Sequence, residues 1–124
     1  MNPRDLENRA VNELHEEGYI TQKALFSLKH LPGGRVISNQ ADFFNIWDII
    51  AVKEEECRLI QVCSGTTVLA HELKIKKSGF PLTSWASQEL WYYYKEAGRW
   101  KRRIEHRTII GWVWFGAKRV GEEQ

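Results

Sequence analysis

A charged side chain stands inside an almost entirely apolar segment of this 124-residue chain. Asp48 lies within residues 43–52, where burying a carboxylate without a partner would be costly. Gln61 follows thirteen residues later, after a charged turn, so it should occupy the neighbouring strand. Glu7 approaches from an expected N-terminal helix. Carboxylate and amide oxygens that converge in this way are ligands for a hard cation such as Mg²⁺, which can assist phosphodiester cleavage by activating water.

The two cysteines, Cys57 and Cys63, both fall in one expected strand. Six residues of strand span about 20 Å, whereas a disulfide needs Cα atoms within about 7 Å, so the two should not pair. Cys63 lies two positions from Gln61 and therefore shares its face of the strand. The chain has no C-x-x-C pair of the kind that marks a zinc site, and Cys63 with His71 is the one Cys/His proximity.

The segment that carries Glu7 has the signals of a helix. Asn2 is suited to cap it, Pro3 to be its first residue, and Gly18 to end it. Apolar residues recur at helical spacing, at Leu6, Ala10, Val11 and Leu14. Glu7 sits at the edge of this apolar stripe, so its side chain should point toward the body of the protein.

The next elements are expected to be strands. Residues 19–27 form a first predicted strand, and the turn signal at 31–35 belongs to a long polar connection, of a length that is more often functional than idle. Residues 43–52 and 58–63 look like paired central strands joined by a hairpin.

Residues 84–97 are assigned to a helix, although three consecutive tyrosines also suit a strand, and 108–115 to a final strand. This order predicts a single α/β domain over residues 1–124, with a central mixed β-sheet flanked by helices. No apolar run approaches the roughly 20 residues that cross a bilayer, and no apolar stretch of a signal peptide follows the polar N-terminus. We therefore expect a cytoplasmic protein with no membrane attachment.

Charge is distributed unevenly, since residues 1–65 hold 7 Lys/Arg and 10 Asp/Glu, whereas residues 66–124 hold 11 and 6. This asymmetry fits an acidic metal centre flanked by a surface for phosphates, and it also fits chance. Four basic residues surround Trp100, which could stack on a base: Arg99, Lys101, Arg102 and Arg103. Their alternative interpretation is a solvated loop or helix end. The polar connection adds Arg35, Ser38 and Asn39 as candidates for phosphate contacts.

Each candidate ligand also has an ordinary interpretation. Asp48 could be a structural carboxylate paired with an arginine or with backbone amides, Glu7 a residue favoured by the helix dipole, and Gln61 a satisfied buried amide. Their joint spacing is what favours a site. Asp42 is a further acidic candidate, more readily explained as a loop or turn residue.

The order and spacing of these segments resemble the motifs of the PD-(D/E)XK nucleases. The closest branch is that of the archaeal Holliday-junction resolvases and small related phage and bacterial proteins. That branch has a helix glutamate eleven residues before a Gly-aromatic pair, as Glu7 stands before Gly18. The Pro-Asp-apolar motif becomes Trp47-Asp48-Ile49-Ile50, and the Glu-x-Lys motif becomes Gln61-Val62-Cys63. The resemblance covers about residues 5–65.

The resemblance implies a restriction-endonuclease-like core and a metal-dependent DNA endonuclease, acting on branched or structured DNA as a homodimer. Glu7, Asp48 and Gln61 would hold Mg²⁺ or Mn²⁺. Cys63 stands where the family has a catalytic lysine, and Lys74 in the following segment is our candidate replacement. The alternative is a catalytically degenerate domain of the same fold, which binds nucleic acid or a protein partner without cleaving.

Overall fold

A computed structural model describes residues 2–24, 26–30, 32–34, 36–40, 42–44 and 46–119, with only the backbone of residues 3, 26–30, 36–40 and 114–119. The elements in chain order are α1 (Pro3–Glu16), β1 (Ile20–Lys23), β2 (Phe26–His30), β3 (Val36–Gln40), β4 (Ile49–Lys53), β5 (Glu56–Ser64), α2 (Val68–Ser78), β6 (Ser87–Glu96), β7 (Arg99–Thr108) and β8 (Gly111–Arg119).

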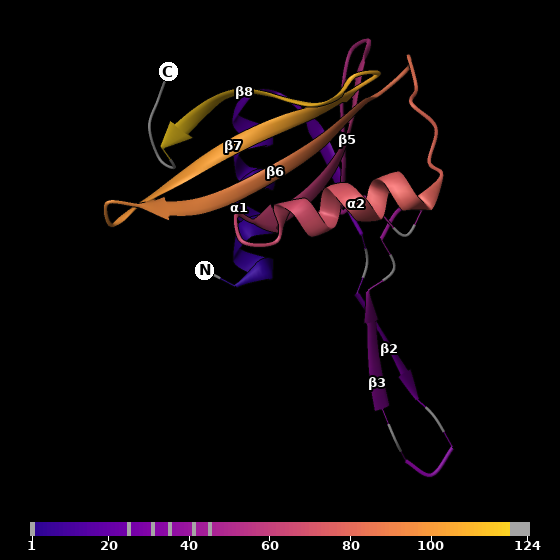
Figure 1. The fold of residues 1–124 in the computed structure, drawn as a ribbon. Helices are drawn as coiled ribbons and strands as arrows, with labels where there is room; N and C mark the ends of the chain where they lie inside the picture. The colour runs from indigo at the N-terminus through magenta and orange to yellow at the C-terminus, as the bar shows by residue number, and fades with distance from the viewer. Residues whose placement is uncertain are drawn as a thin grey trace.

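A six-stranded sheet in the order β1-β4-β5-β6-β7-β8 forms the centre of the fold (Figure 1). Neighbouring strands are antiparallel except β5 and β6, which are parallel and are connected through α2. The expected mixed sheet flanked by helices is therefore confirmed. Strands β2 and β3 form a separate antiparallel hairpin that projects away from this sheet.

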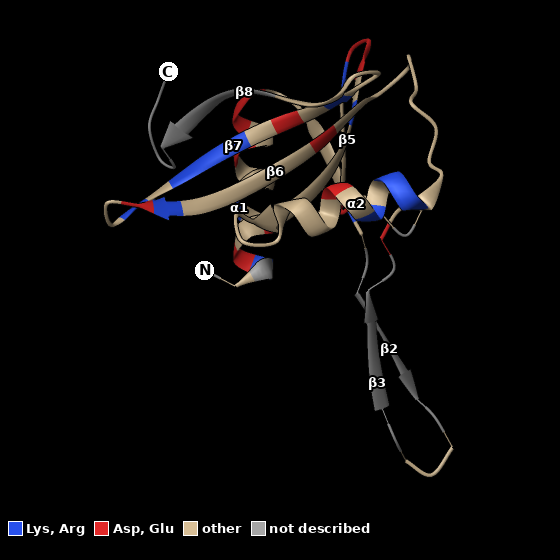
Figure 2. Cartoon of the chain, viewed as in Figure 1, with Lys and Arg blue, Asp and Glu red and all other residues tan. Residues whose placement is uncertain are grey.

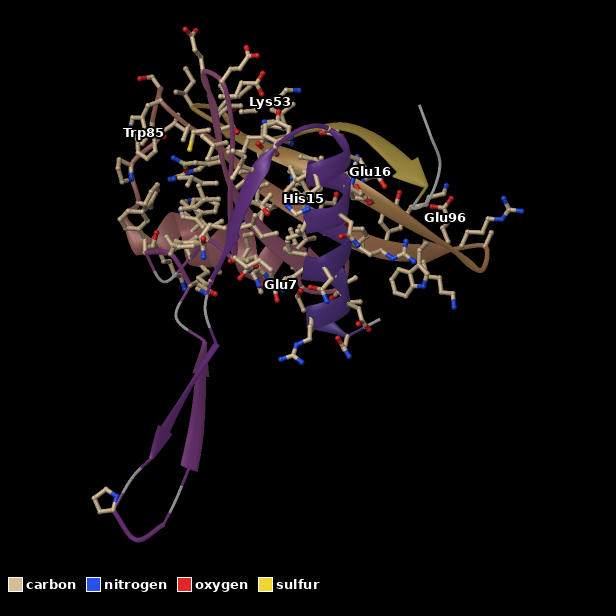
Figure 3. The ribbon with its side chains drawn as sticks, turned by 180° about the vertical axis from the view of Figure 1, so that it is seen from behind. Glu7, His15, Glu16, Lys53, Trp85 and Glu96 are labelled. Carbon is tan, nitrogen blue, oxygen red and sulfur yellow. The ribbon has the colours of Figure 1, made fainter. Side chains whose placement is uncertain are left out.

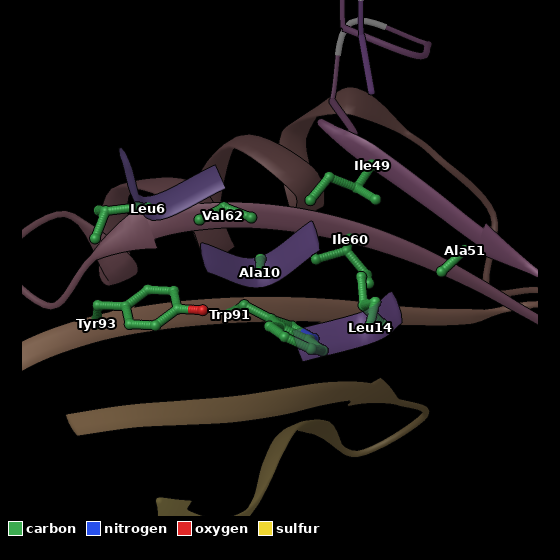
Figure 4. Packing of buried hydrophobic residues seen from close by; sticks show 9 residues of the cluster. All are labelled: Leu6, Ala10, Leu14, Ile49, Ala51, Ile60, Val62, Trp91 and Tyr93. Carbon is green, nitrogen blue, oxygen red and sulfur yellow. The ribbon is translucent and has the colours of Figure 1, made fainter. Parts of the chain in front are cut away.

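Helix α1 begins as its sequence predicts. The side chain of Asn2 accepts a hydrogen bond from the backbone N–H of Asp5, and the carboxylate of Asp5 accepts one from the N–H of Asn2. Gly18 follows the last turn with φ of 91°, a conformation that glycine adopts without strain. The apolar side of α1 packs on one face of the sheet (Figure 4). That core comprises Leu6, Ala10, Leu14, Ile49, Ala51, Ile60, Val62, Trp91 and Tyr93.

Helix α2 covers the other face of the sheet. Leu59 and Leu90 alternate in their strands with residues of the α1 core, and they pack instead with Ile75 of α2. Ile46, Trp47 and Ala86 complete this second core. The two central strands β5 and β6 are consequently buried on both faces.

The helix expected over 84–97 is wrong, because residues 87–96 form the central strand β6. A strand that is buried on both faces shows a continuous apolar run and no polar alternation, so its period is hidden. The helix instead lies at 68–78, where Ile75 is its only fully buried residue.

The expected strands have different limits in the structure. The first ends at Lys23, and part of the expected long connection forms the β2–β3 hairpin. An isolated antiparallel bridge joins Phe43 and Trp47, and β4 begins only at Ile49. Thr108 is the last residue of β7, and the exposed Ile109 and Ile110 form the turn before β8.

Candidate functional site

A cavity of about 470 Å³ lies where β4 begins and β5 continues beyond it. Three carboxylates and one amide line this acidic cavity: Glu7, Asp42, Asp48 and Gln61. Cys63, Ser64, Thr67 and His71 line it as well. Figure 3 shows Glu7 on the side of α1 that faces the β2–β3 hairpin. The structure therefore brings the three expected metal ligands and the position of the motif lysine to one cavity.

Asp48 is held in place by backbone hydrogen bonds. Its N–H donates to the carbonyl of Ile60 at 2.8 Å, and its carbonyl accepts from the N–H of Ala24 at 2.8 Å. Its Oδ2 accepts from the backbone N–H of Val62 and from Nε2 of Gln61, each at 2.8 Å. The expectation that Asp48 lies in the middle of a strand is wrong. It precedes β4, and its side chain binds the edge of β5 where β4 is absent.

Gln61 has one satisfied end and one unsatisfied end. Its side chain is 5% exposed, and its Nε2 donates to Asp48. Its Oε1 is buried and accepts no hydrogen bond from the part of the chain that the structure describes. A buried acceptor without a partner is destabilising, so this oxygen is suited to a ligand that the acidic cavity would hold.

Burial raises the pKa of Asp48 to about 8. The hydrogen bond from Val62 opposes this increase, while the charges of Asp42 and Glu7, and a hydrogen bond with Asp42, add to it. Carboxylates that share a small buried space disfavour one another's ionisation. A bound cation would reverse this effect, because it favours the ionised form of each carboxylate.

Cys63 is a neutral thiol in this environment. It is 5% exposed, and burial raises its pKa to about 12, against the effect of a hydrogen bond with Thr67. It therefore supplies neither the positive charge of a lysine nor a thiolate at neutral pH. Both cysteines are free.

His71 and Asp42 are the members of the acidic cavity to which sequence reasoning gave little weight. Nδ1 of His71 lies 2.8 Å from the carbonyl oxygen of Thr67, the N-cap residue of α2. Because a carbonyl only accepts, Nδ1 carries the proton, and in the neutral ring Nε2 is then an acceptor. Asp42 was expected in a loop, and it lies in one, yet it lines the cavity beside Asp48.

Lys74 does not line the acidic cavity. It is exposed on α2, and no Lys or Arg is among the described residues that line this space. Within the described ranges, no three His, Cys, Asp or Glu side chains lie close enough to hold a metal ion as they stand.

The expected phosphate-binding residues 99–103 form the start of β7, not a loop or helix end. Figure 2 shows cations along this part of the strand, next to the turn that joins β6 and β7. Because side chains of a strand alternate, these residues divide between two faces. Arg103 lies over the rings of Tyr92 and Tyr94, and Lys101 pairs with Glu96 at 3.0 Å.

Arg102 is not available to a phosphate, which corrects its expected role. It is 8% exposed, forms an ion pair with Glu13 of α1, and has its guanidinium 4.7 Å from the ring centroid of Trp91. It ties α1 to the sheet. Arg35 lies outside the described residues, and the side chains of Ser38 and Asn39 on β3 do too.

A larger cavity, of about 550 Å³, lies toward the opposite end of β5. Its charged centre is already neutralised, because Arg58 binds the fully buried Glu89 through two hydrogen bonds of 2.5 and 2.8 Å. Ser87 and Trp91 donate to the same carboxylate. The acidic cavity, by contrast, keeps an unsatisfied acceptor.

Comparison of the chain with protein-family models, with curated proteins and with solved structures found no match. In the part of the chain that the structure describes, no helix combines the length and the apolar character that crossing a membrane requires.

Proposed function

We propose that this chain is a metal-dependent DNA endonuclease whose divalent cation binds in the acidic cavity. The observation that carries the proposal is the buried Oε1 of Gln61, which accepts no hydrogen bond from the described residues beside the carboxylate of Asp48. Glu7 and Asp42 line the same cavity. Carboxylate and amide oxygens are the donors that Mg²⁺ and Mn²⁺ prefer.

The electrostatics of the cavity also favour a cation. Three carboxylates line one small space that contains no Lys or Arg among its described residues, and the pKa of Asp48 is raised. A divalent ion would offset the repulsion between these carboxylates and would give Oε1 of Gln61 a partner. Glu7 or Asp42 would have to move modestly to reach it, because the carboxylates do not form a ready metal site as they stand.

The cation would supply Lewis-acid stabilisation of negative charge on a phosphate. The residues of the chain do the rest. The backbone N–H of Val62 fixes one carboxylate oxygen of Asp48, and the amide of Gln61 is held beside it. His71 lines the cavity, and Nε2 of its neutral ring would accept a proton from water there, which the neutral thiol of Cys63 would not do.

The resemblance to the PD-(D/E)XK nucleases is supported by where the motif positions lie. Glu7, Asp48, Gln61 and Cys63 come from three separate segments and line one cavity. The core order of helix, antiparallel strands, helix and parallel strand is compatible with the expected nuclease-like core. We retain the homodimer and a branched DNA substrate as proposals that follow from this resemblance.

Binding without cleavage is the second candidate, and one observation favours it. The position of the family's lysine is occupied by a buried neutral thiol, and the expected substitute Lys74 is exposed outside the cavity. A domain of this kind would bind a cation or DNA and leave the phosphodiester intact.

The test has two measurements on the same protein. Calorimetric titration with Mg²⁺ and Mn²⁺ should show one site that Asp48→Asn removes, while Glu55→Gln in the exposed β4–β5 turn leaves it intact. Plasmid, linear and four-way-junction DNA incubated with Mg²⁺, Mn²⁺ or EDTA should be cut only with metal. Metal binding without cutting would select the second candidate, and absence of metal binding would refute the cation site.

A further inference from the structure

A third cavity, lined by cations and not by carboxylates, adjoins the acidic one. It measures about 540 Å³, and we call it the aromatic cavity after its principal lining residues: Tyr92, Tyr94, Lys95, Trp100 and Arg103. No Asp or Glu is among its described lining residues. Ser64, at the end of β5, lines both cavities. One short loop therefore separates a space lined by carboxylates from a space lined by aromatic rings and cations.

The aromatic cavity exists because β5 ends before its neighbour does. The last paired residues of β5 and β6 are Ser64 and Tyr93, and β6 continues to Glu96. Gly65 then turns the chain away, its N–H donating to the carbonyl of Tyr93 at 2.8 Å. A Cβ at Gly65 would lie 2.9 Å from Cβ of Tyr94, so only glycine allows the loop to lie this close to β6.

The cations of the cavity form cation–π contacts with its rings. The guanidinium of Arg103 lies 5.5 Å from the ring centroid of Tyr94 and 5.9 Å from that of Tyr92. Nζ of Lys95 lies 5.9 Å from the ring of Trp100. Aromatic faces accept a nucleobase by stacking, and neighbouring cations neutralise the phosphates of the strand that carries the base.

We propose that the aromatic cavity binds an unpaired nucleotide of a DNA strand. Bases inside a duplex are stacked on one another and cannot enter such a cavity, so the occupant is single-stranded. The proposal rests on the proposed function in one respect. It places the phosphodiester to be cleaved on the other side of residues 64–67, toward the acidic cavity. It narrows the substrate to DNA in which an unpaired segment adjoins the cleavage position.

The experiment measures binding in EDTA, where no metal-dependent cutting takes place. A fluorescein-labelled oligo(dT) single strand and a labelled duplex of equal length are titrated with protein, and fluorescence anisotropy is recorded. The variants are Arg103→Gln, which removes one cation, and Tyr94→Leu, which removes a stacking face and keeps apolar volume. Lys77→Gln is the matched control, because it removes an equal charge from an exposed position on α2 that does not line the aromatic cavity.

We expect Arg103→Gln and Tyr94→Leu each to weaken single-strand binding by about fivefold or more, since stacking on one side chain contributes about 1–3 kcal/mol. Lys77→Gln should change it less than about twofold, because its charge lies outside the cavity and is screened by salt. Circular dichroism melting identifies any variant that is unfolded, and Tyr92→Leu then replaces it. A parent that fails to bind single strands, or prefers duplex, overturns the proposal, and so does a Lys77→Gln effect equal to that of Arg103→Gln.

The two proposals fail separately. If the parent binds single strands through the aromatic cavity and cuts no DNA with Mg²⁺ or Mn²⁺, the endonuclease fails and the nucleotide site stands. If the parent cuts DNA and the two cavity variants bind and cut unpaired substrates as the parent does, the nucleotide site fails and the endonuclease stands.

Discussion

The carboxylate of Asp48 accepts the backbone N–H of Val62 at 2.8 Å, at the edge of β5 that β4 leaves uncovered. The carbonyl of Trp47, the preceding residue, is engaged by the N–H of Phe43. The side chain of Asp48 thus accepts the hydrogen bond of an N–H of β5 that the backbone of residues 47 and 48 does not accept. This bond fixes the carboxylate beside Gln61. In that position Asp48 is buried, so its pKa in the folded protein differs from its pKa in the unfolded chain.

The first prediction concerns pH. The pKa of Asp48 is raised by burial from 3.8 to about 8, so the folded protein keeps a proton that the unfolded chain releases above about pH 4. The stabilisation by this group is therefore complete below about pH 4 and is lost as pH rises toward 8. A tenfold difference in proton affinity between the folded and unfolded states corresponds to about 1.4 kcal/mol, so the loss is on the order of a few kcal/mol.

Asp48→Asn should remove this dependence, because an amide can accept the same hydrogen bond from Val62 and does not ionise. Urea unfolding in EDTA between pH 5 and 9 measures the free energy of unfolding of both proteins. The parent should lose stability across this range and the variant should lose less. Parallel curves for the two proteins would show that Asp48 does not titrate here.

The second prediction concerns Gln61→Glu, which adds a carboxylate beside Asp48 and removes the donor that now binds it. In EDTA at pH 8 we expect the melting temperature to fall by about 5 °C or more, because the added charge has no cation to balance it. With Mg²⁺ the increase in melting temperature should exceed that of the parent, since charged ligands bind the ion more tightly. An equal response of both proteins to Mg²⁺ would place the ion elsewhere.

The third prediction concerns the contribution of Arg102 on β7 to the stability of the fold. Arg102→Ala leaves Glu13 without its partner between α1 and the sheet, and should cost about 3–5 kcal/mol of unfolding free energy. Arg99→Ala, on the exposed end of the same strand, should change stability by less than about 0.5 kcal/mol. Chemical denaturation measures both. A small effect of Arg102→Ala would mean that the ion pair with Glu13 contributes little.

Local signals in the sequence were enough to predict α1. Its cap at Asn2 and its apolar spacing involve neighbouring residues only, and the side of the helix that carries Glu7 follows from them. The convergence of Asp48 and Gln61 was likewise predictable, because a short hairpin joins β4 and β5.

The remaining parts depend on contacts between distant segments. Strand β6 was mistaken for a helix because α1 and α2 cover both its faces, so its polar alternation is absent. Helix α2 was missed because Ile75 alone is fully buried, and His71 was therefore not placed in the acidic cavity. The burial of Arg102 could not be predicted from a charged stretch until the strand and its inward face were known.

The last prediction concerns the position at which the chain departs from the nuclease motif. Cys63→Lys would place an ammonium group in a cavity lined by Glu7, Asp42 and Asp48, whose charges offset the cost of burying it. If the absence of the lysine ammonium limits cleavage, metal-dependent nicking of plasmid should increase by about tenfold or more, within the range that a positioned proton-transfer group supplies. Cys57→Lys is the matched control, because the same substitution then falls outside the acidic cavity.

Adding Asp48→Ala to Cys63→Lys should abolish the gain, since the cation site is lost while the ammonium is kept. A parent that already nicks DNA and is slowed by Cys63→Lys would mean that another group fills the lysine's role. His71 is our candidate for that group, because it lines the acidic cavity, whereas Lys74 lies outside it. His71→Ala should then lower the nicking rate by about a hundredfold without changing Mg²⁺ affinity. If parent, Cys63→Lys and His71→Ala all bind DNA and none cuts it, the chain is a binding domain.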